Sequence, residues 1–103
     1  MSGLLGKAAV PANVYTDLYT VPAGKVASAT VSYCNRTAAD ITVRLAVRNA
    51  AIADADYLEF GAMVPANGVL ERGGIALSAG EIITVRASAV GISARAHGFV
   101  EAA

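Results

Sequence analysis

The sequence predicts a small antiparallel β-sandwich, either a jelly roll or an immunoglobulin-like fold, with an extended N-terminal arm. Three observations support this all-β class. Apolar residues recur with a period of two over most of the chain. Turn signals separate these runs about every 8–12 residues. The length of 103 residues suits one domain and is too short for two ordinary ones.

The arm is predicted over residues 1–13, which show no clean period and contain Pro11. Such a segment is expected to need a neighbouring surface before it becomes ordered. Because ordering costs about 1–2 kcal/mol per residue in backbone entropy, its apolar side chains must find an apolar groove on an adjacent subunit. The sandwich domain is assigned to residues 14–103. The apolar side chains of the arm are Leu4, Leu5 and Val10.

The clearest strand is predicted over residues 40–48. Ile41, Val43 and Leu45 alternate there with polar residues, which is typical of a half-buried antiparallel strand. A helix would scatter these side chains around its circumference. Weaker runs of the same period predict the remaining strands at 14–20, 25–34, 56–60, 69–77, 81–88 and 92–100.

Turn residues mark the connections between these strands. Pro22 and Gly24 favour a tight turn, and Asn67-Gly68 is a strong turn dipeptide. Gly73-Gly74 interrupts its run and predicts a bulge or bend. Asn35-Arg36-Thr37 matches the glycosylation acceptor pattern. We interpret it as a turn, in which Asn tolerates a left-handed backbone, because no secretory signal is evident.

Composition narrows the classes of partner. Eight Lys and Arg balance eight Asp and Glu, so no basic excess points to nucleic acid. No stretch approaches the roughly 20 apolar residues of a membrane span. Residues 1–7 are too short and too weakly apolar for a signal peptide, so a soluble protein made in the cytoplasm is expected. We therefore expect neither nucleic acid nor membrane as a partner.

Few residues are candidates for catalysis or for binding a metal. His97 is the only histidine, and no acid stands at a diagnostic spacing from it. Cys34 lacks a local base, so it is expected to be a small, mostly buried thiol. Asp54, Asp56 and Glu59 lack the glycine and ligand spacing of a calcium loop. The sequence therefore predicts no enzyme: it offers no catalytic residue, no cofactor and no metal site.

The four tyrosines leave one binding function open. Tyr15 and Tyr19 share a face of their predicted strand, and with Tyr57 and the fourth tyrosine they would form a stacking platform for sugars or bases. Cross-strand packing is the commoner use of such residues. A carbohydrate-binding module is therefore an alternative, and it requires exposed aromatic rings that converge on one patch. The fourth tyrosine is Tyr33.

The core is expected to be thin because much of the apolar fraction is alanine, which contributes little burial energy. A partner or self-association would add stability. Arginines on the outward faces of their strands are candidates for interface ion pairs, the other interpretation being solvated surface charges. They are Arg44, Arg48, Arg86 and Arg95.

Several segments of the chain resemble those of a known class of proteins. The start contains Leu4-Leu5-Gly6, and later phrases span 18–25, 34–37, 43–47, 56–59, 69–81 and 85–88. Together they resemble small virion proteins of tailed bacteriophages, over nearly the whole chain. The resemblance implies a compact β-sandwich on the particle and brings no catalytic motif.

The resemblance implies a non-enzymatic virion protein, made in the host cytoplasm. We expect a capsid decoration or cement protein that packs on and between neighbouring subunits and stabilises the particle. Its partners would be the major capsid protein or tail proteins, and itself, as a homo-oligomer for which analogy favours a trimer. The alternatives are a tail or baseplate component, or a carbohydrate-binding module for host recognition.

Overall fold

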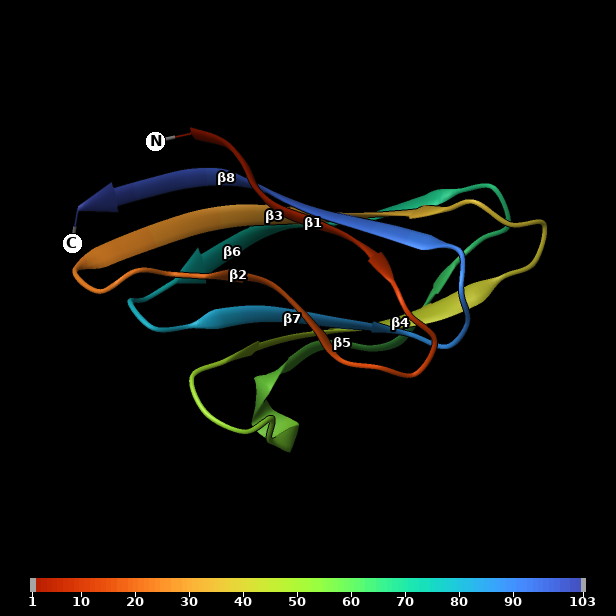
Figure 1. Cartoon of the computed structure of the whole chain (residues 1–103), viewed down its shortest axis with the longest axis horizontal. Coiled ribbons are helices and arrows are strands. Elements are labelled where there is room, and N and C mark those ends of the chain that lie inside the picture. The colour runs from red at the N-terminus through yellow and green to blue at the C-terminus, as the bar shows by residue number, and fades with distance from the viewer. Residues whose placement is uncertain (1, 103) are drawn as a thin grey trace.

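The alternation in the sequence is realised as eight strands in the computed structural model, which describes residues 2–102 (Figure 1). A 3₁₀ turn, η1 (Asp54–Asp56), lies between the fourth and fifth strands. The predicted small antiparallel β-sandwich is confirmed. The strands are β1 (Ser2–Val10), β2 (Thr16–Thr20), β3 (Lys25–Asn35), β4 (Ile41–Arg48), β5 (Tyr57–Val64), β6 (Val69–Leu77), β7 (Ile82–Ala87) and β8 (Ile92–Ala102).

The strand order decides between the two predicted topologies. One sheet has the order β1-β8-β3-β6 and the other β2-β7-β4-β5. The first four strands pair antiparallel with the last four, β1 with β8, β2 with β7, β3 with β6 and β4 with β5. The chain is thus one long ribbon rolled into two packed sheets. This is the eight-stranded jelly roll, and an immunoglobulin-like order is excluded.

The core lies between the two sheets and is formed by the inward residues of each strand. Leu45, Ile83 and Ile92 are fully buried, and Tyr33 is the largest side chain among them. Burial raises the pKa of Tyr33, and the negative charge of Glu59 adds to this. Small alanines on β3 and β8 complete the inner face, which gives the thin core that the composition predicts. They are Ala27, Ala29, Ala94 and Ala96.

The predicted arm is wrong for the described part of residues 1–13. Residues Ser2–Val10 form β1, which pairs with β8 inside the same domain, and Val10 is only 2% exposed. The division at residue 13 therefore does not separate an arm from the domain. The strand shows no clean period because its register shifts between Leu4 and Gly6. Met1 lies outside the described residues.

Gly6 explains how β1 can lie so close to β2. A Cβ atom added at Gly6 would sit 1.9 Å from the carbonyl oxygen of Leu18, a distance that no side chain tolerates. Glycine is therefore required by close backbone approach. The same residue weakened the strand signal in the sequence, since glycine is rare in strand interiors.

The predicted bulge at Gly73-Gly74 is confirmed. The register of β3 against β6 shifts between Ala29 and Val31, which leaves these glycines without partners on β3. Gly74 has φ of +69°, a left-handed conformation that costs other residues energy. The bulge bends β6, the outer strand of its sheet.

Asn35 is buried and organises the β3–β4 turn through its side chain. Its amide donates to the carbonyls of Ala39 at 2.7 Å and Val64 at 3.1 Å. Its Oδ1 accepts from the backbone N–H and hydroxyl of Thr37 at 2.9 and 2.7 Å. The predicted turn is present, but Asn35 itself does not have the left-handed backbone that was expected. Among the described residues other than glycine, Asn13 and Asn67 have it.

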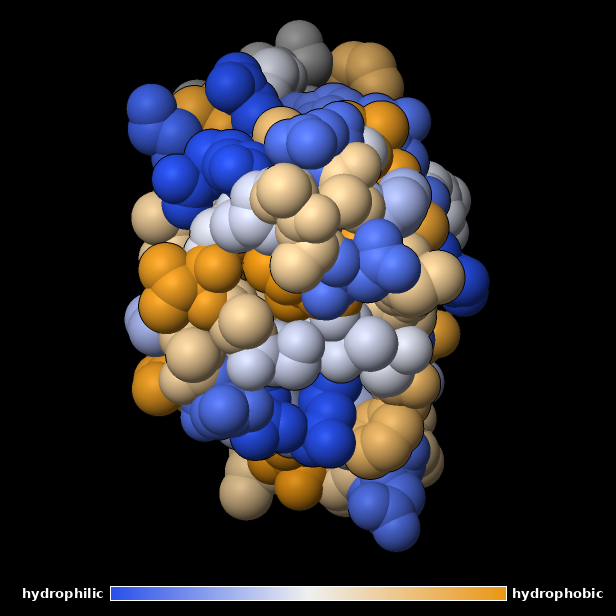
Figure 2. Space-filling model, turned by 90° about the vertical axis from the view of Figure 1, so that its right-hand side faces the viewer, coloured by the Kyte–Doolittle hydropathy of each residue, from blue (hydrophilic) through white to orange (hydrophobic). Residues whose placement is uncertain are grey.

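The loops gather at the two ends of the sandwich. The β1–β2, β3–β4, β5–β6 and β7–β8 connections lie together at the right-hand end in Figure 1. Viewed onto that end, hydrophobic and hydrophilic side chains are interspersed (Figure 2). The start of β1 and the end of β8 lie at the opposite end.

Candidate functional site

Two arginines face each other on the outer surface of the β2-β7-β4-β5 sheet. Arg44 on β4 and Arg86 on β7 are direct cross-strand partners. Both project outward because their neighbours Val43, Leu45 and Val85 point into the core. Like charges directly opposite each other are destabilising, so this pair needs compensation from its surroundings.

Aromatic rings supply part of that compensation. The guanidinium carbon of Arg44 lies 4.0 Å from the ring centroid of Phe60, its cross-strand partner on β5. The guanidinium carbon of Arg86 lies 5.4 Å from the ring centroid of Tyr15. A cation over an aromatic face is attracted by the ring quadrupole. A left-handed glycine, Gly61 with φ of +76°, sits in the β5 bulge that places Phe60 opposite Arg44.

Hydrogen bonds link these side chains into one cluster. Arg44 donates to the hydroxyl of Tyr15 at 3.0 Å, and the hydroxyls of Tyr15 and Tyr57 are hydrogen-bonded to each other. The ring of Tyr57 meets Phe60 edge-on with centroids 5.0 Å apart. Arg86 donates to Oδ1 of Asn13 at 3.1 Å. We call these six side chains the arginine–aromatic cluster: Asn13, Tyr15, Arg44, Tyr57, Phe60 and Arg86.

The hydrogen bond between the hydroxyls of Tyr15 and Tyr57 shifts their pKa values in opposite directions. The hydrogen bond with Tyr57, followed by that from Arg44, lowers the pKa of Tyr15 below its ordinary value. The hydrogen bond to Tyr15 raises the pKa of Tyr57. The hydrogen bond to Tyr15 also raises the pKa of Arg44. Of the two tyrosines, Tyr15 is thus the first to ionise as pH rises.

A cavity of about 250 Å³ opens directly at the arginine pair. Another cavity, of about 380 Å³, lies apart from it. The polar lining of the cavity at the arginine pair joins the two guanidinium groups with one amide and two hydroxyl side chains. Asn13 reaches it because its backbone N–H donates to the carbonyl of Ala87 at 2.8 Å. The polar lining residues are Asn13, Thr42, Arg44, Arg86 and Ser88.

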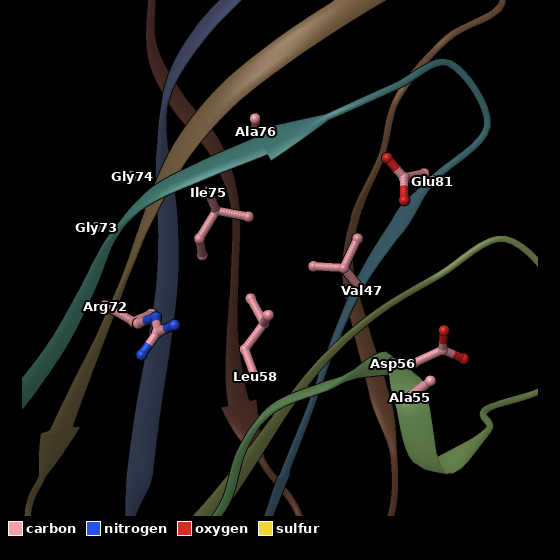
Figure 3. A pocket seen from close by; sticks show the side chains of 10 residues that line it. All are labelled: Val47, Ala55, Asp56, Leu58, Arg72, Gly73, Gly74, Ile75, Ala76 and Glu81. Carbon is pink, nitrogen blue, oxygen red and sulfur yellow. The ribbon is translucent and has the colours of Figure 1, made fainter.

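The cavity of about 380 Å³ lies where β5 and β6 leave the edge of the sandwich open (Figure 3). Its apolar side chains include Leu58 and Ile75, which point toward each other. Two carboxylates lie on its far side from Arg72, but each already accepts from a backbone N–H. Asp56 accepts from Ala53 at 2.9 Å and Glu81 from Ser78 at 2.6 Å. These contacts make both carboxylates structural.

Arg48 is engaged within the chain, not available as a free interface charge. It donates to both carboxylate oxygens of Asp17 at 2.9 and 3.1 Å, and to the hydroxyl of Thr84 at 3.0 Å. This contact joins β2, β7 and β4. Burial alone would raise the pKa of Asp17, but the hydrogen bonds from Arg48 and Thr84 and the charge of Arg48 together lower it.

The outer surface of the β1-β8-β3-β6 sheet carries large apolar side chains. Phe99 on β8 is 59% exposed, and its diagonal neighbours Leu4 on β1 and Val26 on β3 are 44% and 38% exposed. We call these three residues the apolar stripe. Leu4 thus lies on an open surface, as an interface residue must, whereas Leu5 packs against the core. Arg95 is exposed on the same face, opposite Lys7.

Several predicted site residues take other places. Tyr19 packs against the core, because the register of β2 shifts between Asp17 and Tyr19 and moves it away from the face of Tyr15. Cys34 is exposed, so the predicted buried thiol is wrong. Its outward position follows from alternation, since Tyr33 before it points inward. Sequence reasoning missed Asn13 and Phe60, which only strand pairing brings to the arginines.

Other groups of reactive side chains are sparse in the described residues. Within residues 2–102, no group of three histidine, cysteine or acidic side chains could hold a metal ion. His97 is half-buried on β8, and its Nδ1 is buried without a hydrogen-bond partner. In the part of the chain that the structure describes, no helix is long and apolar enough to cross a membrane.

Comparison of the chain with protein-family models, with curated proteins and with solved structures found no match.

Proposed function

We propose that this chain is a non-enzymatic structural component of a tailed-phage virion, a capsid decoration protein that packs on and between neighbouring subunits. The observation that carries the proposal is the apolar stripe of Leu4, Phe99 and Val26. Exposed apolar patches mark surfaces that contact other proteins, and these three side chains stand on adjacent strands of one sheet face. The eight-stranded jelly roll, which viral capsid domains use widely, supports the same function.

The geometry of the stripe suits a stable contact between rigid surfaces. Its residues stand on three neighbouring strands, so their backbones are fixed by the sheet before any partner arrives. A preorganised surface loses little conformational entropy when it binds. Repetition over many copies on a particle adds avidity to each contact. The partners in this proposal are the major capsid protein and other copies of this chain, arranged as a trimer.

The proposal is tested on phage particles released from cells that encode the chain. Tailed-phage particles banded on a density gradient are analysed by mass spectrometry, and the chain is expected at many copies per particle. Its presence only among the soluble proteins of the lysate would reject the virion assignment. A location on isolated tails and not on heads would favour the tail or baseplate alternative.

The contact surface is tested separately with purified protein. Phe99→Ser is expected to abolish binding to particles that lack the chain, because it removes the centre of the apolar stripe. Val90→Ser is the matched control, since Val90 is even more exposed than Phe99, at 70% against 59%, but lies in the β7–β8 loop at the other end. Equal binding by both variants would exclude the stripe as the contact. Light scattering of the unmodified protein shows whether it forms the expected trimer.

A second candidate function is a carbohydrate-binding module for host recognition. The observation that favours it is the arginine–aromatic cluster, in which Tyr15 and Tyr57 converge with Phe60. Phe60 is 64% exposed and Tyr15 39% exposed, so ring surface is open to a sugar. Binding on a glycan array that is lost in Tyr15→Ala would support this function. An array without any signal would reject it.

A further inference from the structure

We propose that the cavity between Arg44 and Arg86 binds the oxyanion group of an acidic saccharide, whose ring lies against the neighbouring aromatic side chains. This inference rests on the second candidate function and deepens it, because it names the class of sugar. It is carried by the charge, the hydrogen-bond donors and the ring surfaces that meet at this cavity.

The charge at the cavity is positive and unpaired. Arg44 and Arg86 are direct cross-strand partners, yet among residues 2–102 the ion pair that forms is Arg48–Asp17, on another part of the sheet. Neither cavity arginine has a carboxylate partner among the described residues. Arginine is well suited to bind carboxylate, phosphate or sulfate, because its planar group donates two parallel hydrogen bonds.

The donors at the cavity are already positioned. The rings of Phe60 and Tyr15 lie beside the two guanidinium groups in cation–π contacts, and Asn13 and the Tyr15 hydroxyl fix one donor of each. Nε of Arg86 is buried and has no hydrogen-bond partner. A buried donor without a partner is costly. Because this nitrogen has almost no accessible surface, the side chain of Arg86 must shift before an anionic acceptor can satisfy it. The remaining donors are preorganised, as oxyanion recognition requires.

The size of the cavity limits what enters it. Its volume of about 250 Å³ is small beside the roughly 300–1,000 Å³ of pockets that enclose whole drug-sized ligands. It therefore suits one charged group of a larger molecule. The remainder of that molecule would lie over the exposed rings of Tyr15 and Phe60, and the hydroxyls of Thr42 and Ser88 offer further hydrogen bonds. Aromatic faces beside hydroxyl and amide groups favour a sugar ring.

A second pair of opposed cations provides an internal comparison. Lys7 on β1 and Arg95 on β8 are also cross-strand partners, and they line a cavity on the other sheet. The other residues of that cavity are alanines and Ser93, so it has no ring to support a sugar. The proposal therefore places the ligand at Arg44 and Arg86, and not at Lys7 and Arg95.

The experiment is an NMR titration of the full chain labelled with ¹⁵N. The probes are sodium glucuronate and glucose 6-phosphate, compared with glucose, acetate and inorganic phosphate. Either acidic sugar is expected to shift the amide signals of Thr42, Arg86 and Ser88, and to bind about tenfold or more tightly than glucose. Glucuronate should also bind more tightly than acetate, and glucose 6-phosphate more tightly than inorganic phosphate. Added salt should weaken the binding, since the contact is ionic.

Variants confirm the location. Arg86→Gln and, on the neighbouring strand, Arg44→Gln are each expected to weaken binding of the acidic sugar about tenfold to a hundredfold. Arg36→Gln is the matched control, because it removes the same charge from an exposed loop residue outside the cavity. Dispersed amide spectra verify that each variant is folded. If one of the two arginine variants does not fold, the other, on a different strand, still tests the site.

Every other outcome rejects the proposal in a distinct way. Equal binding of glucose would leave the carbohydrate function standing and reject the oxyanion site. Equal binding of acetate or phosphate would keep an oxyanion site and reject the saccharide. Shifts confined to Ser93 and Arg95 would move the site to the other sheet. No binding of any probe would reject this inference, while a glycan array that still gave signal would keep the second candidate function.

Discussion

The carboxylate of Asp17 on β2 accepts from one guanidinium nitrogen of Arg48 on β4 at 2.9 and 3.1 Å, across the intervening strand β7. Thr84 of β7 completes the contact by donating its hydroxyl to Asp17 at 2.8 Å. Three strands are thereby linked on the outer surface of one sheet. Asp17 is half exposed, so the pair is expected to stabilise the fold only modestly.

This pair predicts a dependence of stability on pH. Because the pKa of Asp17 is lower in the folded chain than in the unfolded chain, the pair stabilises the fold at neutral pH. Its contribution is lost as pH falls from the ordinary carboxyl value of about 4 through the lowered value. Asp17→Asn should therefore reduce stability at pH 7 but little at pH 2, as measured by urea unfolding. Asp54→Asn, at an exposed carboxylate, is the control. An equal loss at both pH values would contradict the prediction.

Removing the side chain of Asn35 should weaken the fold strongly. Asn35→Ala leaves the carbonyls of Ala39 and Val64 without their donor, and it removes the acceptor for Thr37. Buried polar groups that lose their partners cost about 1–3 kcal/mol each, so a loss of about 2–4 kcal/mol is expected. The measurement is the free energy of unfolding in urea. Ser28→Ala, at an exposed serine on the same strand, should change it by less than about 0.5 kcal/mol.

Adding one methyl group at Gly6 should displace β1. The new Cβ would overlap the carbonyl oxygen of Leu18, which is backbone and cannot move aside. Overpacking of this kind costs about 1–3 kcal/mol. Hydrogen exchange should show faster opening of β1 in Gly6→Ala than in the unmodified chain. Gly73→Ala is the control, because its Cβ would meet only the Thr30 hydroxyl at 3.5 Å. Unchanged exchange in Gly6→Ala would show that β1 packs less closely than the structure has it.

The hydroxyl pair of Tyr15 and Tyr57 should be visible in a titration of absorbance at 295 nm. Tyr15 is expected to ionise below the ordinary tyrosine pKa of about 10, because its hydrogen bonds with Tyr57 and Arg44 lower its pKa. Tyr57→Phe removes the larger of these effects and should raise the pKa of Tyr15. Tyr19→Phe, in a ring that packs against the core, should leave this early step unchanged. An early step that survives Tyr57→Phe would contradict the assignment.

The sequence predicted the fold class because burial on one side of a sheet imposes a period of two on the chain. Residues 40–48 show this directly, since Ile41, Val43 and Leu45 are all buried in β4. The glycine pair at 73–74 predicted its bulge for a similarly local reason, the left-handed φ that glycine adopts cheaply. The prediction for Cys34 was wrong, because its apolar character suggested burial whereas its place next to the inward Tyr33 turns it outward.

Tertiary structure alone decided what the local pattern does not encode. Strand β1 carries no clean alternation, because a register shift and the close approach of Gly6 to Leu18 interrupt it, so it resembled an unpaired arm. The arginine–aromatic cluster depends on strand order, which brings β7 and β5 to either side of β4. It depends also on bulges, which set Phe60 opposite Arg44 and turn Tyr19 away from Tyr15. Pairing between distant segments is a property of the whole chain, so no single stretch of sequence reveals it.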